Sequence, residues 1–339
     1  MKKRTAGLGI LAIAAIGLGI SIADDKNVAF VYWNTSTNAF QEMALGVKQA
    51  VKESSGVNLV STAPNNNNPA QVVQMFQSAA QTSKDGIILQ ALVADLFVRP
   101  VKEATAAGIP VIAIDAPPPA NSGVDLFVSN DNVEVGRMLA REIIKDIPVT
   151  AKGEVVLGTT GIGVPPLEQR LVGMKEILSK ERPNVTIIGP ISTNGQTGSP
   201  SEVYEVWNGI VKSRPNALAF MAPSNADAAA LATLQRQTGK RLLVGGCDLE
   251  PTALQGVKDG YIKALASPEH WLKGYIAMKV LINYTQKGIP IPKGFWNSGA
   301  LLITKANIGT MIARQANEAT RAAWFRTIAA RQLAKPPLK

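Results

Sequence analysis

Polar side chains follow the short apolar runs of this chain, and their types suit a ligand rich in hydroxyl groups. Amides and carboxylates pair with vicinal hydroxyls, arginine adds a two-pronged donor, and aromatic rings pack on the apolar face of a sugar. Phosphate chemistry fits less well, because the loop Gly158 to Gly163 lacks the Gly-Lys-Ser/Thr and GxGxxG patterns. The polar set is Tyr32-Trp33-Asn34, Gln90, Asp115, Asn130-Asp131-Asn132, Thr159-Thr160-Gly161, Ser224-Asn225, Cys247-Asp248 and Ser267.

The counts of cysteine and histidine argue against catalysis and metal binding. One cysteine, Cys247, excludes an intramolecular disulfide framework and a CxxC site, and one histidine, His270, excludes a multi-histidine metal site. We interpret His270 as a surface or satisfied loop residue without a catalytic role. Asp131 paired with Asp115 as the acid and base of a glycosidase is a less favoured alternative. We expect neither enzyme activity nor a cofactor.

The positive charge lies mainly at the two ends of the chain. The formal net charge is +10, of which Lys2, Lys3 and Arg4 contribute three and residues 313–339 contribute five, so residues 24–312 carry +2. A nearly neutral body disfavours nucleic-acid binding.

Residues 1–23 have the pattern of a secretory signal peptide. A cationic start precedes an apolar run from Ala6 to Ile20, and Ser21-Ile22-Ala23 supplies small residues at the expected cleavage site. An uncleaved anchor helix is the alternative. We expect cleavage after Ala23 and a periplasmic protein.

Apolar strands alternate with helical periodicity along the rest of the chain. Val28 to Tyr32 is a predicted strand, and the apolar stripe from Phe40 to Val51 predicts a helix after it. The pattern occurs in two series, which predicts an α/β fold of two doubly wound parallel-sheet lobes joined by a three-stranded hinge. We expect a signal peptide over 1–23, one lobe over 24–129 and 267–296, a second over 130–266 and 297–312, and a basic helical tail over 313–339.

The order of these segments resembles the type I periplasmic solute-binding proteins of ABC importers, in particular the ribose-binding-like sugar-binding branch. The resemblance covers almost all of Lys26 to Ile308. It is carried by Val28-Ala29-Phe30-Val31, Thr37-Asn38-Ala39-Phe40, Asn68-Pro69-Ala70, Gly108 to Asp115, Asp131-Asn132-Val133 with Gly136, Arg170 with Gly173, Val244 to Asp248, and Ser298 to Thr304.

The resemblance implies a ligand site between the lobes. It places Phe40, Gln90, Asp115, Arg170, Asn225 and Asp248 against the ligand, and we add Trp33 and Thr37 as candidates. Ala116 stands where ribose binders carry an arginine, and Cys247 replaces a stacking aromatic, so we expect a neutral sugar or polyol other than ribose.

Each candidate also has a structural alternative. Asp115 and Asp248 could cap the next turn, and Asn225 could cap a helix. Arg170 could form a solvated ion pair with Glu168 or Glu176. Gln90 could be a rim residue, whereas Phe40 and Trp33 could belong to the core.

The favoured function is the capture of a small neutral carbohydrate or polyol by a monomeric protein that delivers it to an ABC permease in the inner membrane. A sensing receptor of the same fold for chemotaxis or signalling is one alternative, and an exported sugar-processing enzyme is a less favoured one. For the tail, we favour one basic amphipathic helix packed on one lobe over a membrane-binding helix, and expect truncation after Ile312 to leave affinity unchanged.

Overall fold

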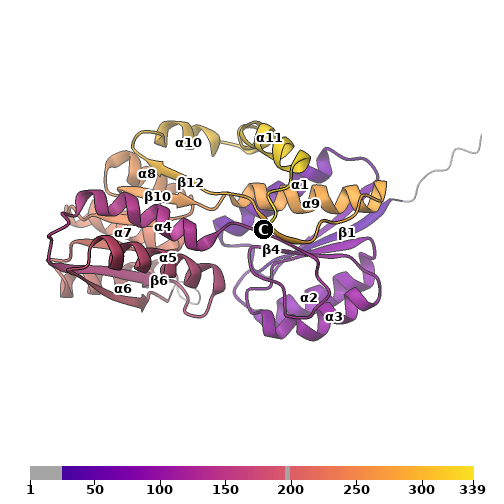
Figure 1. The fold of residues 1–339 in the computed structure, drawn as a ribbon, viewed down its shortest axis with the longest axis horizontal. Helices are drawn as coiled ribbons and strands as arrows, with labels where there is room; N and C mark the ends of the chain where they lie inside the picture. The colour runs from indigo at the N-terminus through magenta and orange to yellow at the C-terminus, as the bar shows by residue number, and fades with distance from the viewer. Residues whose placement is uncertain (1–24, 195–198) are drawn as a thin grey trace, which may run out of the picture.

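Val, Ile, Leu and Ala runs form the strands at the centre of two lobes, which lie side by side in the computed structural model (Figure 1). The structure describes residues 25–194 and 199–339, so the expected signal peptide lies outside the described residues. Each lobe contains one sheet, and each sheet has six strands. The α/β fold with two mostly parallel sheets is therefore confirmed.

The first sheet is parallel throughout and has the strand order β11-β5-β4-β3-β1-β2. Its strands are β1 (Lys26–Val31), β2 (Val57–Thr62), β3 (Gly86–Leu89), β4 (Val111–Ile114), β5 (Leu126–Ser129) and β11 (Gly294–Asn297). The helical segments of this lobe are α1 (Asn38–Lys52), α2 (Pro69–Thr82), the 3-10 turn η1 (Ala94–Phe97), α3 (Val98–Ala106) and α9 (His270–Lys287).

The second sheet has the order β12-β10-β9-β8-β6-β7, and β12 is antiparallel to β10. Its strands are β6 (Gly153–Thr159), β7 (Val185–Ser192), β8 (Ala219–Met221), β9 (Val244–Cys247), β10 (Ala264–Ser267) and β12 (Leu301–Thr304). The accompanying helical segments are α4 (Asn132–Ile143), η2 (Ile144–Asp146), α5 (Pro165–Glu181), α6 (Pro200–Ser213), α7 (Asn225–Thr238), α8 (Pro251–Asp259) and α10 (Ile308–Arg314).

Helices cover both faces of each sheet, which explains the unbroken apolar strands. In β1, Val28 and Phe30 belong to one core cluster with α1 and α9, while Ala29 and Val31 belong to another with α2 and α3. Because both faces are buried, successive side chains of a central strand are all apolar.

The chain passes between the sheets after β5, after β10 and between β11 and β12. Two of these passages are bonded to each other, because the amide and hydroxyl of Ser298 both donate to the carbonyl of Ser129. The amide of Asp131 also donates to Asn297 Oδ1. The passages after β5 and between β11 and β12 are therefore joined to each other.

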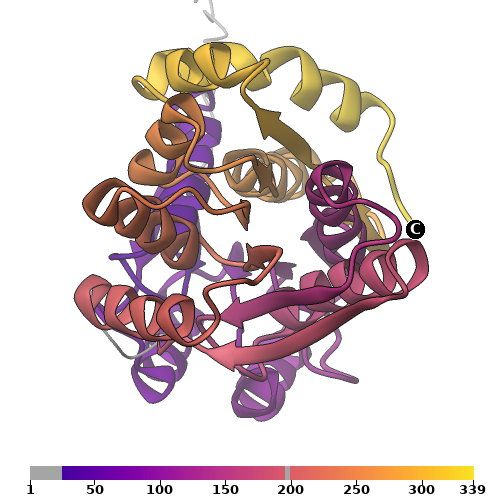
Figure 2. The same cartoon turned by 90° about the vertical axis from the view of Figure 1, so that its left-hand side faces the viewer.

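The tail differs from the single helix on one lobe that the sequence suggests. A break at residues 315–317 separates α10, whose Ile308 and Met311 enter the core of the second lobe, from α11 (Glu318–Ala334). Phe325 of α11 enters the core of the first lobe, and the tail runs from one lobe toward the other (Figure 1). Seen end-on, the tail lies along one edge of the molecule (Figure 2). Within the described ranges, no helix has both the length and the apolar character needed to cross a bilayer.

Candidate functional site

Each lobe contributes one aspartate from the same position in its sheet. Asp115 follows β4 and Asp248 follows β9, and their φ angles are 67° and 68°, a left-handed conformation that aspartate tolerates better than most residues. The Asp115 amide donates to the carbonyl of Val128, and the Asp248 amide donates to that of Ala266. Each turn is thus held to the neighbouring strand, β5 or β10.

The two carboxylates lie in a cleft between the lobes. Its empty volume, including its open mouth, is about 570 Å³. The first lobe lines it with Thr37, Ala39, Phe40, Asn67, Leu92, Asp115 and His270; the second with Thr160, Val164, Pro166, Leu167, Arg170, Ser224, Asn225 and Asp248.

Two buried side chains donate hydrogen bonds to the Asp115 carboxylate. The ammonium of Lys273 donates to Oδ1 at 2.5 Å, and the amide of Gln90 donates to Oδ2 at 2.9 Å. Burial opposes the negative charge, but nearby positive charges, that of Lys273 foremost, outweigh it and hold the pKa of Asp115 below its usual value. Asp115 is therefore an ionised acceptor and not a turn cap.

Asp248 is held in a similar way in the second lobe. Its Oδ1 lies 2.9 Å from His270 Nε2, and its Oδ2 lies 3.5 Å from Arg170 Nη1. Burial again opposes the charge, and Arg170 and His270 lower the pKa of the carboxyl group despite it. The alternative of a cap is wrong here as well, because Glu250 occupies the N-cap of the next helix.

Arg170 is almost fully buried on α5 and does not form the expected alternative ion pairs. Its Nε donates to Asn132 Oδ1 at 3.0 Å, and its Nη1 donates to the carbonyl of Pro223 at 2.6 Å. Glu176 instead binds Arg137, and Glu168 accepts from the amide of Gly163. Arg170 is thus oriented toward the cleft by three groups of its own lobe.

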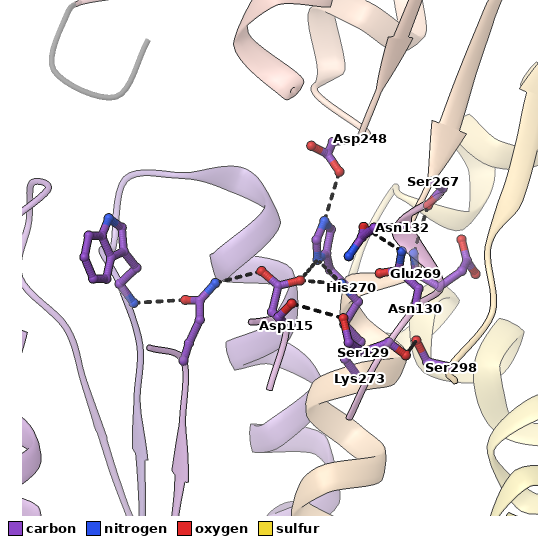
Figure 3. Close-up of polar contacts among 12 residues, drawn as sticks. Asp115, Ser129, Asn130, Asn132, Asp248, Ser267, Glu269, His270, Lys273 and Ser298 are labelled. Atoms are coloured by element: carbon purple, nitrogen blue, oxygen red, sulfur yellow. Dashed lines mark hydrogen bonds and ion pairs between the residues drawn. The ribbon is translucent and has the colours of Figure 1, made fainter. Parts of the chain in front are cut away.

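The interpretation of His270 as a surface or loop residue is wrong. His270 is the first residue of α9, is 7% exposed and lines the cleft. Lys273, one turn later, is fully buried beneath it (Figure 3). Sequence reasoning missed both residues. A single histidine and a lysine three positions later form no motif that would indicate their partners, which are distant in the sequence.

Of the predicted site residues, the structure brings six together in the cleft: Thr37, Phe40, Asp115, Arg170, Asn225 and Asp248. Trp33 and Gln90 lie behind its wall. Trp33 is part of the core of the first lobe, and its backbone amide donates to Gln90 Oε1 at 3.0 Å. Gln90 is fully buried and acts on the cleft through Asp115.

Two further sequence interpretations change, those of Asn225 and Asp131, and Cys247 is buried. Asn225 is the first residue of α7 and not its cap, which is Ser224; its amide donates to Glu250 Oε1 at 2.9 Å. Asp131 caps α4 by accepting from the Glu134 amide and does not line the cleft with Asp115. Burial raises the pKa of Cys247 to about 12, so this residue is an uncharged thiol behind Asp248.

The cleft chemistry is that of reversible binding to hydroxyl groups. Carboxylates, an arginine, amides and hydroxyls meet apolar surface from Phe40, Leu92 and Leu167. In the described part of the chain, no three His, Cys, Asp or Glu side chains are placed to hold a metal ion.

Comparisons with known proteins agree with one another on the family of this chain. The family model described as a periplasmic binding protein domain matches residues 28–289. The D-allose-binding periplasmic protein of Escherichia coli is 24% identical over 272 residues, which cover 77% of this chain and 86% of that protein. The ribose import binding protein of Salmonella typhimurium is 26% identical over 266 residues, 78% of this chain and 86% of that one.

A solved structure has the same fold. It is an ABC transporter solute-binding protein from Burkholderia graminis in complex with D-arabinose, with a TM-score of 0.77 and 25% identity. The alignment covers 84% of this chain and 97% of that one.

Proposed function

We propose that this chain, which belongs to the periplasmic binding protein domain family, captures a small neutral sugar or polyol and delivers it to an ABC permease. One observation carries the proposal: Asp115 of one lobe and Asp248 of the other line the same cleft as oriented, ionised acceptors. A ligand that donates hydroxyl groups to both carboxylates would join the lobes and favour their closure about the hinge, a motion typical of periplasmic binding proteins.

The balance of charge supports an uncharged ligand. The negative charges of Asp115 and Asp248 face the positive charges of Arg170 and Lys273, and all four residues are buried. A sugar acid would add an unpaired negative charge, which is costly to bury. The names of the relatives agree with this, because allose, ribose and arabinose are neutral sugars.

The proposal includes the location and partners of the protein. The chain would act as a monomer in the periplasm after removal of residues 1–23, and the closed lobes would contact a permease in the inner membrane. Cell fractionation tests the location. Co-purification of the protein with the candidate permease would favour the transport role over the sensing role.

Calorimetry and thermal unfolding with a panel of ligands test the binding function. D-Ribose, D-allose, D-arabinose and ribitol form the neutral arm, and gluconate forms the charged arm. We expect one neutral compound to bind at one site per chain, to raise the melting temperature and to be recovered unchanged. Binding of gluconate alone, or conversion of the ligand into a product, would contradict the proposal.

A further inference from the structure

Two residues of α9 join the carboxylates of the two lobes. His270 and Lys273 are three residues apart and so lie on the same side of the helix. Lys273 Nζ is 2.5 Å from Asp115 Oδ1 and 3.3 Å from His270 Nδ1. His270 Nε2 is 2.9 Å from Asp248 Oδ1. The four side chains form one continuous line across the cleft floor (Figure 3).

The chemistry of lysine determines the direction of these bonds. An ammonium group has three donors and no acceptor, so the nitrogen that faces it, His270 Nδ1, must accept. The ring proton then resides on Nε2, which donates to Asp248. A second proton on Nδ1 would point at the ammonium group, and Asp115 Oδ1 is 3.8 Å away, beyond hydrogen-bond distance.

We propose that Lys273 and His270 form a hydrogen-bond relay, with His270 in its neutral Nε2-protonated form, that links Asp115 of one lobe to Asp248 of the other. In this relay both are positioning residues: His270, which lines the cleft, acts through Asp248, and Lys273 acts through Asp115. The binding role rests on the proposed function, whereas the relay itself does not.

The relay has a consequence for specificity. It directs donors of Lys273 to Asp115 and His270 and the ring donor of His270 to Asp248, while Nε and Nη1 of Arg170 are bonded to Asn132, Pro223 and Asp248. The carboxylates are then fixed acceptors with capacity for further bonds. A ligand must offer them hydroxyl donors at a separation that the relay sets.

The relay can be tested without a ligand, because His270 is the one histidine of the chain. Nitrogen-15 labelling of histidine in the full protein, purified without a polyhistidine tag, gives two ring signals that belong to His270 alone. We expect a protonated Nε2 and an unprotonated Nδ1 at neutral pH. A charged ring, or a proton on Nδ1, would overturn the relay.

The binding role is tested with paired substitutions and the sugar that binds the wild type most tightly in the neutral panel. His270→Gln retains a donor and an acceptor, whereas His270→Leu removes both; Lys273→Arg retains the charge, whereas Lys273→Met removes it. We expect the apolar variants to weaken binding at least about tenfold, as the loss of a bond to a charged group implies. The conservative variants should restore most of the affinity.

Lys287→Met is the matched control, since Lys287 is exposed at the other end of α9. The sugar affinity of this variant should equal that of the wild type. If His270→Leu and Lys273→Met bind as tightly as this control, the binding role is overturned. If the wild type binds no neutral compound, both the proposed function and the binding role are contradicted. The nitrogen-15 signals of His270 still test the relay in that case.

Discussion

At the residue scale, the site depends on charges that are buried in pairs. Asp115 is 3% exposed and Lys273 is fully buried, so each would be costly to bury without the other. The same holds for Asp248 and Arg170, which are 4% and 2% exposed. We therefore expect these residues to combine ligand binding with stability, so that a substitution that removes one charge changes both.

We predict that Asp115→Asn lowers the free energy of unfolding by about 3–5 kcal/mol, because the ammonium of Lys273 remains buried without its counter-charge. Urea denaturation measures this loss. Asp125→Asn is the control, since Asp125 pairs with Lys293 in an ion pair whose side chains are 51% and 80% exposed and should cost about 1 kcal/mol or less. Equal effects of the two substitutions would contradict the prediction.

The pH dependence of stability has a defined sign. The pKa of Asp115 is lower in the folded chain than its usual value of 3.8, because nearby positive charges, that of Lys273 foremost, outweigh the effect of burial. The stabilisation by its charge is therefore complete above the usual value and is lost as the pH falls below it. Asp227 opposes this trend, because burial raises its pKa.

We therefore predict that the free energy of unfolding falls less steeply in Asp115→Asn than in the wild type when the pH is lowered from about 5 to about 2.5. Comparing the two proteins cancels the contribution of Asp227. Denaturation curves at several pH values measure both slopes, and parallel slopes would show that Asp115 does not carry the effect.

At the element scale, closely packed helix pairs place the charged residues. A Cβ atom at Gly173 of α5 would lie 2.0 Å from the carbonyl oxygen of Val133 in α4, and one at Gly136 would lie 1.9 Å from that of Arg170. In the first lobe, Gly46 of α1 and Gly274 of α9 have the same relation to the opposite helix. The backbones that carry Arg170 and His270 are thus positioned by glycine contacts.

We predict that Gly173→Ala separates α5 from α4, lowers the free energy of unfolding by about 1–3 kcal/mol and weakens sugar binding by displacing Arg170. Gly209→Ala is the control, because Gly209 lies in α6 with open space around it, and alanine there should be neutral or stabilising by up to about 1 kcal/mol. Denaturation and calorimetry of both variants measure the effects. Unchanged affinity in Gly173→Ala would show that α5 need not approach α4 so closely.

At the scale of the whole molecule, the tail is an additional connection between the lobes. α10 packs in the second lobe, while Phe325 of α11 stacks on Trp271 with ring centroids 5.0 Å apart. Arg321 also pairs with Glu42 of α1 at 2.9 Å. Trp271 therefore anchors the tail and does not extend the cleft. The connection should limit how far the lobes open.

We predict that truncation after Ile312 weakens sugar binding and enlarges the ligand-free protein, contrary to the expectation from the sequence. The truncation removes Arg314, which is bound to the buried carboxylate of Glu269 at 3.1 Å next to His270. Calorimetry and the radius of gyration from X-ray scattering measure the two effects. Arg331→Ala, at an exposed site on α11, is the control, and a truncated chain that matches it in both measurements would contradict the prediction.

The sequence by itself determined the two-lobe fold and the strand ends that carry Asp115 and Asp248. Apolar runs, helical periodicity and turn residues are local patterns, and in parallel sheets they define the edge at which ligand groups gather. The partners of those groups are not local. Lys273 is 158 residues from Asp115, and no spacing in the chain relates the two.

Tertiary structure alone decided which polar residues line the cleft and which support them. Gln90 and Trp33 follow strands just as Asp115 does, yet the packing of the first lobe places both behind the cleft wall. His270 enters the site because the chain returns from β10 to the first lobe there. Similarly, the path of the tail depends on the stacking of Phe325 on Trp271, a contact between segments that are distant in the sequence.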